Sequence, residues 1–113
     1  MAANVVFTPE FKRNLRVLSK KYRHIRDDIE PLIDTLQNGE LPGDLVTGTS
    51  YTIFKVRVPN RDVQRGKSGG YRIIYYLQTQ TDIILVTIYS KTEQADISAA
   101  QIWRIVNEFE TEK

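Results

Sequence analysis

The sequence predicts a single α+β domain over residues 1–113, with a small, mainly antiparallel sheet and helices packed on one face of it. Two observations support this prediction. Apolar residues recur at helical spacing before residue 38 and after residue 96, whereas the segments between are rich in β-branched and aromatic residues. No repeat or linker divides the chain. The predicted order is strand, helix, helix, three strands, helix.

The N-terminal part predicts a short strand at residues 4–7 and then a helix. The Thr8 hydroxyl can cap a helix, and Pro9 is tolerated at its first position. Apolar residues follow at spacings of four, four, three and four, the stripe of an amphipathic helix: Phe7, Phe11, Leu15, Leu18 and Tyr22.

A second helix completes a predicted helical hairpin. Its apolar stripe consists of Ile25, Ile29, Leu32, Ile33 and Leu36. Because proline is tolerated only in the first turn, Pro31 predicts a cap between Arg26 and Asp28. Asn38 and Gly39 end the helix.

Strands are predicted at residues 51–58, 71–77 and 83–90, where β-branched and aromatic residues dominate. The short polar connection at 78–82 predicts an antiparallel hairpin between the last two. A glycine-rich, cationic loop at 59–70 joins the first two, and a final helix is expected around residues 97–109.

Composition excludes several kinds of site. With no cysteine, the chain has no disulfide, no thiolate zinc site and no cysteine nucleophile. A single histidine excludes a two-histidine ribonuclease mechanism, and no carboxylates show metal-ligand spacing, so we expect no metal and no cofactor. No apolar run approaches the ~20 residues of a membrane span, and we expect a cytoplasmic protein.

Positive charge is concentrated in two segments, although the net charge is only +2. Residues 12–26 hold seven cations and no carboxylate, which we interpret as the solvated face of a helix. Residues 55–72 hold six cations against Asp62 alone, which is typical of a surface that binds a polyanion.

Strand alternation predicts where the second group of cations lies. Lys55 and Arg57 fall on the opposite face from Phe54, and a face with two cations is expected to be wet. If the strand registers align, the residues that converge on one groove are Lys55, Arg57, Arg72, Tyr89 and Lys91. Cations that hold phosphates beside aromatic rings suit single-stranded nucleic acid.

Four runs carry a resemblance to a known family: FKVRV (54–58), GKSGG (66–70), YRIIYY (71–76) and TIYSK (87–91). Together they resemble the RelE toxins of type II toxin–antitoxin pairs, within the RelE/ParE superfamily and closest to its RelE/HigB-like branch. The resemblance extends over nearly the whole chain. It implies a ribosome-dependent mRNA endoribonuclease that inhibits translation, held in check by a cognate antitoxin of the helix-turn-helix kind.

The same resemblance implies site residues. Lys55 and Arg57 match the basic positions of the family's strand, Arg72 the arginine of its GYR motif, and Lys91 the lysine that closes the last strand. Some members carry a catalytic tyrosine after that strand, where this chain has none; the nearby substitutes are Tyr89 and Glu93. The loop cations Arg61, Arg65 and Lys67 are expected to bind RNA.

RNA cleavage by attack of a 2′-hydroxyl on the adjacent phosphate needs a base, an acid and positive charge, but no metal. Arg57 and Arg72 suit the charge, and Lys55 or Lys91 the proton transfers. Tyr89 as base needs its pKa lowered from about 10 by neighbouring cations, and Glu93 is an ordinary base. Two alternatives stay open: a ParE-like DNA gyrase poison, and an inactive nucleic-acid- or partner-binding module.

Overall fold

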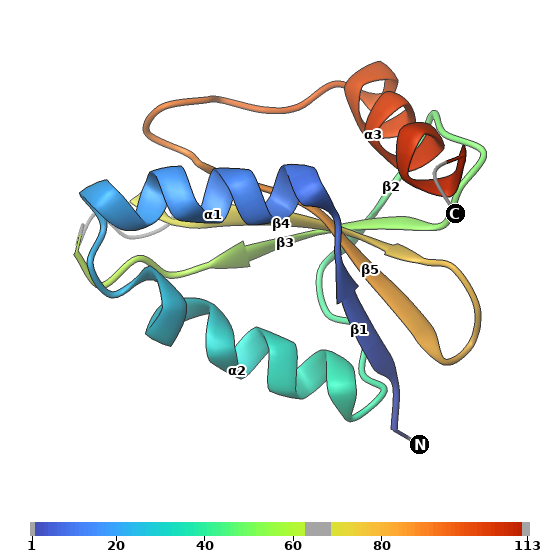
Figure 1. The fold of residues 1–113 in the computed structure, drawn as a ribbon, viewed down its shortest axis with the longest axis horizontal. Helices are drawn as coiled ribbons and strands as arrows, with labels where there is room; N and C mark the ends of the chain where they lie inside the picture. Colours follow the sequence, from blue (N-terminus) through green and yellow to red (C-terminus); the bar gives the residue numbers. More distant parts are fainter. Residues whose placement is uncertain (1, 63–68, 112–113) are drawn as a thin grey trace.

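The computed structural model describes residues 2–62 and 69–111 (Figure 1). Along the chain its elements are β1 (Asn4–Phe7), α1 (Pro9–Lys21), α2 (Ile25–Gln37), β2 (Asp44–Val46), β3 (Ile53–Val58), β4 (Tyr71–Leu77), β5 (Asp82–Ser90) and α3 (Ala99–Thr111). Among the helices described, none is long and apolar enough to cross a lipid bilayer.

The strands form one sheet in the order β1-β5-β4-β3-β2. Every neighbouring pair is antiparallel except β1 and β5, which are parallel. The predicted α+β class with a mainly antiparallel sheet is confirmed. The strand β2 was not predicted, because three residues are too few to show a period; it forms where the chain pairs with the edge of β3.

The predicted start of α1 is confirmed. The Thr8 hydroxyl accepts a hydrogen bond from the Phe11 amide at 3.0 Å and donates one to the Val86 carbonyl of β5 at 2.7 Å. Thr8 therefore both caps α1 and fastens it to the sheet. Pro9 occupies the first turn, where no amide proton is needed.

The predicted cap of α2, between Arg26 and Asp28, is wrong by two to four residues. The helix begins at Ile25 with His24 as its cap, so Pro31 lies in the helix interior. Proline there cannot donate to the Asp27 carbonyl one turn earlier. Ile25 is fully buried, and its packing favours a helix that begins at Ile25 although Pro31 then falls after the first turn.

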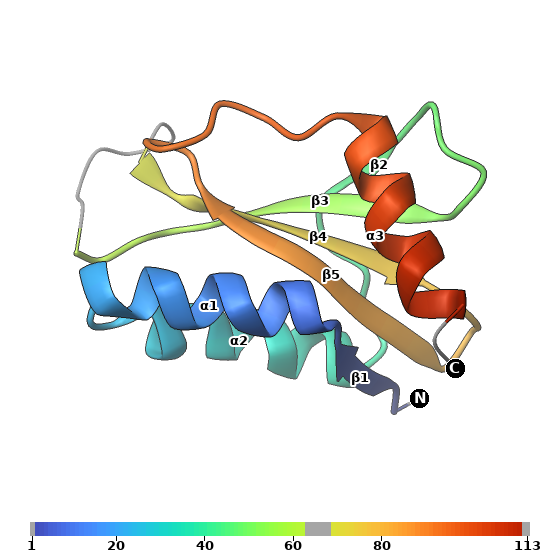
Figure 2. The same ribbon diagram turned by 45° about the horizontal axis from the view of Figure 1, so that its top comes forward.

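Helices cover both faces of the sheet, which corrects the prediction of helices on one face. The helices α1 and α2 pack on one face, against residues such as Ile73 and Tyr75. The helix α3 packs on the opposite face, where Ile102, Ile105 and Val106 contact Ile53, Ile74 and Val86. Strand residues alternate between faces, so these three would otherwise expose a second apolar patch. Figure 2 shows α3 across the sheet from α1 and α2.

The helix α3 covers only part of its face. Ile53 begins β3, and the cations of β3 lie farther along the same strand, beyond the apolar contacts with α3. The segment from Lys91 to Ser98 connects β5 to α3 across this end of the sheet (Figures 1 and 2). A polar region thus adjoins the α3 contact on one face.

Candidate functional site

The strand registers align three side chains in a row across the sheet. Arg57 of β3 lies directly opposite Arg72 of β4, and Arg72 lies directly opposite Tyr89 of β5. Lys55 lies two residues before Arg57 and therefore shares this face. We call Arg57, Arg72 and Tyr89 the cross-strand row.

Two arginines at directly opposite positions repel each other, because like charges across a strand pair destabilise it. An anion bound between Arg57 and Arg72 would offset this repulsion. The forked donors of arginine match the oxygens of a phosphate group.

Gly70, which precedes β4, allows the Arg57 side chain to lie close to the backbone. A Cβ atom at this position would stand 2.7 Å from the Val58 carbonyl oxygen and 3.4 Å from Arg57 Nε. The first distance is shorter than real Cβ atoms show, and the contact is with backbone, which cannot swing away. Gly70 therefore has a steric role beside Arg57.

Asp96 joins this site from the segment between β5 and α3. Its Oδ1 accepts hydrogen bonds from Lys55 Nζ at 3.2 Å, from the Tyr89 hydroxyl at 3.3 Å and from the Ile97 amide at 2.8 Å. The Ile97 amide, and after it Lys55, hold the pKa of Asp96 below its usual range. Asp96 is thus an ionised carboxylate beside Lys55 and the row.

Asp96 was missed from the sequence. It lies in a segment without periodicity, five residues after the Lys91 that closes β5, and a carboxylate there resembles many helix-preceding residues. A usable signal was the shortage of other acidic residues near the cationic strands. Only the path of the segment back over the sheet brings Asp96 to Lys55.

The pKa of the Tyr89 phenol is raised, not lowered. Burial raises its pKa to about 12, and the charge and hydrogen bond of Asp96 add to this rise, while Arg72 acts against it. The lowered pKa that Tyr89 would need to act as a base is therefore not met, because burial outweighs Arg72. Tyr89 therefore keeps its proton at neutral pH and can donate it.

Glu93 lies on the other side of β5 from the expected place. Its carboxylate accepts a hydrogen bond from the Tyr22 hydroxyl at 3.3 Å and lies 3.8 Å from Lys21 Nζ, both at the end of α1. Among the described residues, Asp96 is the carboxylate that contacts Lys55, and a role for Glu93 as base stays a prediction.

The backbone of Lys91 lies next to the cross-strand row, whereas its side chain lies along the turn at residues 91–95. Its amide donates to the Gly70 carbonyl at 3.0 Å, which continues the β4–β5 pairing, and its Nζ donates to the Ala95 carbonyl. The backbone therefore adjoins the site, while the ammonium group holds the 91–95 turn.

The loop cations expected to bind RNA fall into two groups. Arg61 lies with α2: its Nε contacts Asp28 Oδ1 at 2.9 Å and its amide donates to Asp28 Oδ2 at 3.1 Å. The Asp28 side chain is only 5% exposed, and a buried carboxylate needs such a partner, whereas the binding of RNA by Arg61 stays a prediction. Arg65 and Lys67 lie outside the described residues.

Within residues 2–62 and 69–111, no three histidine or acidic side chains gather in a way that would hold a metal ion. What the site offers instead is two arginines at opposed positions on one sheet face, beside an ionised carboxylate, Asp96, that accepts hydrogen bonds from Lys55 and from the protonated phenol of Tyr89. These groups can bind an anion and exchange protons with it.

Comparison with known families identifies the class of protein. The family model described as the ParE toxin of type II toxin–antitoxin system, parDE, matches residues 5–95, which run from β1 through β5. The predicted superfamily is confirmed, while the RelE/HigB-like branch stays a prediction. The match ends one residue before Asp96. The chain belongs to the ParE toxin family of type II toxin–antitoxin systems, within the RelE/ParE superfamily.

Proposed function

We propose that this toxin is a metal-independent endoribonuclease that cleaves mRNA on the ribosome and so inhibits translation in the cytoplasm. The observation that carries the proposal is the pair of opposed arginines beside Tyr89, Lys55 and Asp96. A toxin that acts only by binding a protein needs no such set of acid, base and fixed charge on one strand face. A phosphodiester uses all of it.

The reaction is a displacement at phosphorus. The RNA 2′-oxygen bonds to the adjacent phosphorus, and the bond from phosphorus to the 5′-oxygen breaks. The products are a 2′,3′-cyclic phosphate and a 5′-hydroxyl. Arg57 and Arg72, which face each other across β3 and β4, hold the phosphate and stabilise the charge that develops on its oxygens.

Two proton transfers accompany the displacement. Asp96, ionised beside Lys55, accepts the proton of the 2′-hydroxyl. Tyr89, whose raised pKa keeps it protonated, gives its proton to the departing 5′-oxygen. The hydrogen bond between the Tyr89 hydroxyl and Asp96, at 3.3 Å, then returns the proton to the phenol and restores the site.

Membership of the family implies a cognate antitoxin. We propose a helix-turn-helix partner that covers the cross-strand row or keeps the toxin from the ribosome. Arg65 and Lys67 would bind RNA, and Lys91 would hold the turn that carries Asp96 to Lys55.

The test is induction of the chain in a bacterial host, with primer extension on several abundant mRNAs. We expect breaks within translated regions, and 2′,3′-cyclic phosphate ends on the upstream fragments. Arg72→Ala should abolish the breaks, whereas Arg104→Ala, which removes an exposed arginine from α3, should leave them unchanged. Intact mRNA during growth arrest by the wild type would refute the proposal.

One observation favours a second candidate: the matching family model is that of ParE. A gyrase poison would cause DNA breaks and a DNA-damage response in the same cells while mRNA stays intact. The same experiment therefore separates the two activities, and a chain without any effect on growth would favour a binding module.

A further inference from the structure

The two packed helices α1 and α2 carry opposite charge. The helix α1 holds five cations and one carboxylate, whereas α2 holds one cation and four carboxylates. The net charge of +2 hides this separation. An anionic partner that approaches the helical hairpin is therefore drawn to α1 and repelled by α2.

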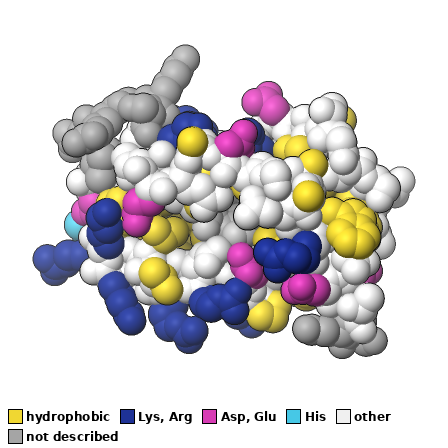
Figure 3. All heavy atoms as spheres, turned by 90° about the horizontal axis from the view of Figure 1, so that it is seen from above, with side chains coloured by type: hydrophobic (Ala, Val, Ile, Leu, Met, Phe, Trp, Pro, Cys, Tyr) yellow, Lys and Arg dark blue, Asp and Glu magenta, His cyan; other side chains and the backbone are white. Residues whose placement is uncertain are grey.

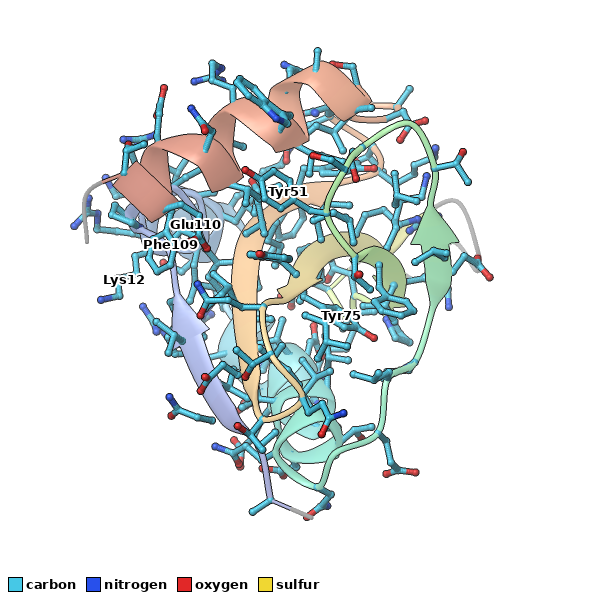
Figure 4. All side chains as sticks on the ribbon, turned by 90° about the vertical axis from the view of Figure 1, so that its right-hand side faces the viewer. Lys12, Tyr51, Tyr75, Phe109 and Glu110 are labelled. Carbon is cyan, nitrogen blue, oxygen red and sulfur yellow. The ribbon has the colours of Figure 1, made fainter. Side chains whose placement is uncertain are left out.

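Three of the α1 cations form a line that we call the α1 ridge: Lys12, Arg16 and Lys20. They follow one another at intervals of four residues, about 6 Å along the helix axis. All three are exposed and lie opposite the buried stripe of α1. Lys12 extends outward from the edge of the molecule in Figure 4.

No carboxylate within residues 2–62 and 69–111 pairs with the ridge. Arg13 is paired with Glu10 and Lys21 with Glu93, but none of the ion pairs found among the described residues includes a member of the ridge. Like charges four residues apart on a helix repel each other. The ridge therefore costs stability in the free protein, and a bound polyanion would offset that cost.

A hollow of about 200 Å³ connects α1 with the strand that bears Tyr89. Asn14, Val17 and Leu18 line it from α1, and Ile88, Tyr89, Ser90, Glu93 and Gln94 line it from β5 and the turn after it. The one carboxylate in this lining, Glu93, lies 3.8 Å from Lys21 Nζ, which offsets its negative charge. Val17, beside the ridge, is 59% exposed. Figure 3 shows lysine and arginine side chains gathered along the edge that α1 forms.

We propose that the α1 ridge binds the phosphate backbone of the RNA strand that flanks the scissile phosphate. The inference rests on the proposed nuclease function. The RNA strand runs from the cross-strand row over the hollow, where the exposed Val17 packs against a nucleotide, to the three cations. Binding by the ridge is independent of sequence, because its lysine and arginine side chains contact phosphates.

The test compares two variants that lose the same charge. Lys12→Gln/Arg16→Gln/Lys20→Gln removes the ridge, and Arg23→Gln/Arg26→Gln/Arg104→Gln removes three exposed cations outside it. The probe is a fluorescent 20-nucleotide 2′-O-methyl RNA, which lacks the attacking hydroxyl, and its affinity is measured by anisotropy over a range of KCl concentrations. Loss of three phosphate contacts should reduce the slope of log K against log salt by about 2 in the ridge variant alone.

Cleavage of ribosome-bound mRNA completes the test. The ridge variant should show a raised KM and an unchanged kcat, because the ridge lies away from the reacting atoms. An unchanged salt slope in the ridge variant, or an equal loss of RNA affinity in both variants, would overturn the inference about the ridge. Cleavage of mRNA by the wild-type protein would still support the nuclease proposal in that case. If the wild-type protein cleaves no mRNA, both the nuclease proposal and the inference about the α1 ridge are refuted. Loss of binding to a 20-residue polyglutamate peptide, with RNA binding intact, would assign the ridge to an acidic protein instead.

Discussion

Replacement of Asp96 by asparagine should separate RNA binding from RNA cleavage. Asp96 lies 3.2 Å from Lys55 Nζ and 3.3 Å from the Tyr89 hydroxyl, so the substitution removes one negative charge and one proton acceptor with little change of shape. The two partners of the ion pair are 36% and 63% exposed, and such a pair contributes less than about 1 kcal/mol to stability. The variant should therefore fold normally.

The two functional effects have opposite signs. Removal of a unit charge near the bound phosphate removes a repulsion of about 1 kcal/mol at 4 Å in water, which makes RNA binding about fivefold tighter. Loss of the proton acceptor lowers the cleavage rate by about 10²- to 10⁴-fold. The pKa of Tyr89 should also fall, because the charge and hydrogen bond of Asp96 both raise it.

The assays are single-turnover cleavage of mRNA on programmed ribosomes, anisotropy with 2′-O-methyl RNA, and ultraviolet titration of tyrosine against a Tyr89→Phe reference. Asp34→Asn, which removes an exposed carboxylate from α2, is the matched control and should leave all three unchanged. Cleavage at the wild-type rate by the Asp96→Asn protein would refute its role as proton acceptor.

Two further predictions concern the surroundings of the row. Gly70→Ala should destabilise the fold by about 1–3 kcal/mol, because the new Cβ meets the Val58 carbonyl oxygen at 2.7 Å, and it should impair cleavage because Arg57 is displaced. Urea unfolding and mRNA cleavage measure the two effects. A Gly70→Ala protein with wild-type stability and cleavage would contradict the steric role. The folded-state pKa of Tyr89 lies above its unfolded value, so its contribution to stability is full below about pH 10 and is lost as the pH rises through about 12. Urea unfolding between pH 8 and 11.5 should show this fall, reduced in Tyr89→Phe; equal curves for both proteins would exclude it.

The fold class followed from local patterns. Apolar spacing predicted α1, Thr8 and Pro9 predicted its start, and β-branched runs predicted β3, β4 and β5. These signals are readable because each reflects the geometry of a single element. The start of α2 and the strand β2 were not predicted, because burial of Ile25 and pairing with β3 decide them.

The candidate site was predictable only where strand alternation governs it. Alternation alone predicts that Lys55 and Arg57 share a face, and the run around residues 71–76 supplied Arg72. The exact opposition of Arg57 and Arg72 depends on register, which the sequence does not reveal.

The sequence by itself determined an α+β toxin of the RelE/ParE superfamily with cations on one strand face. The tertiary structure decided that α3 covers part of that face, that Asp96 rather than Glu93 contacts Lys55, and that Arg61 forms an ion pair with Asp28. These contacts join residues about 30 to 40 positions apart or more, through loops whose paths follow from packing and from the need to pair buried charge. No regular spacing of residues along the sequence predicts the course of such a loop.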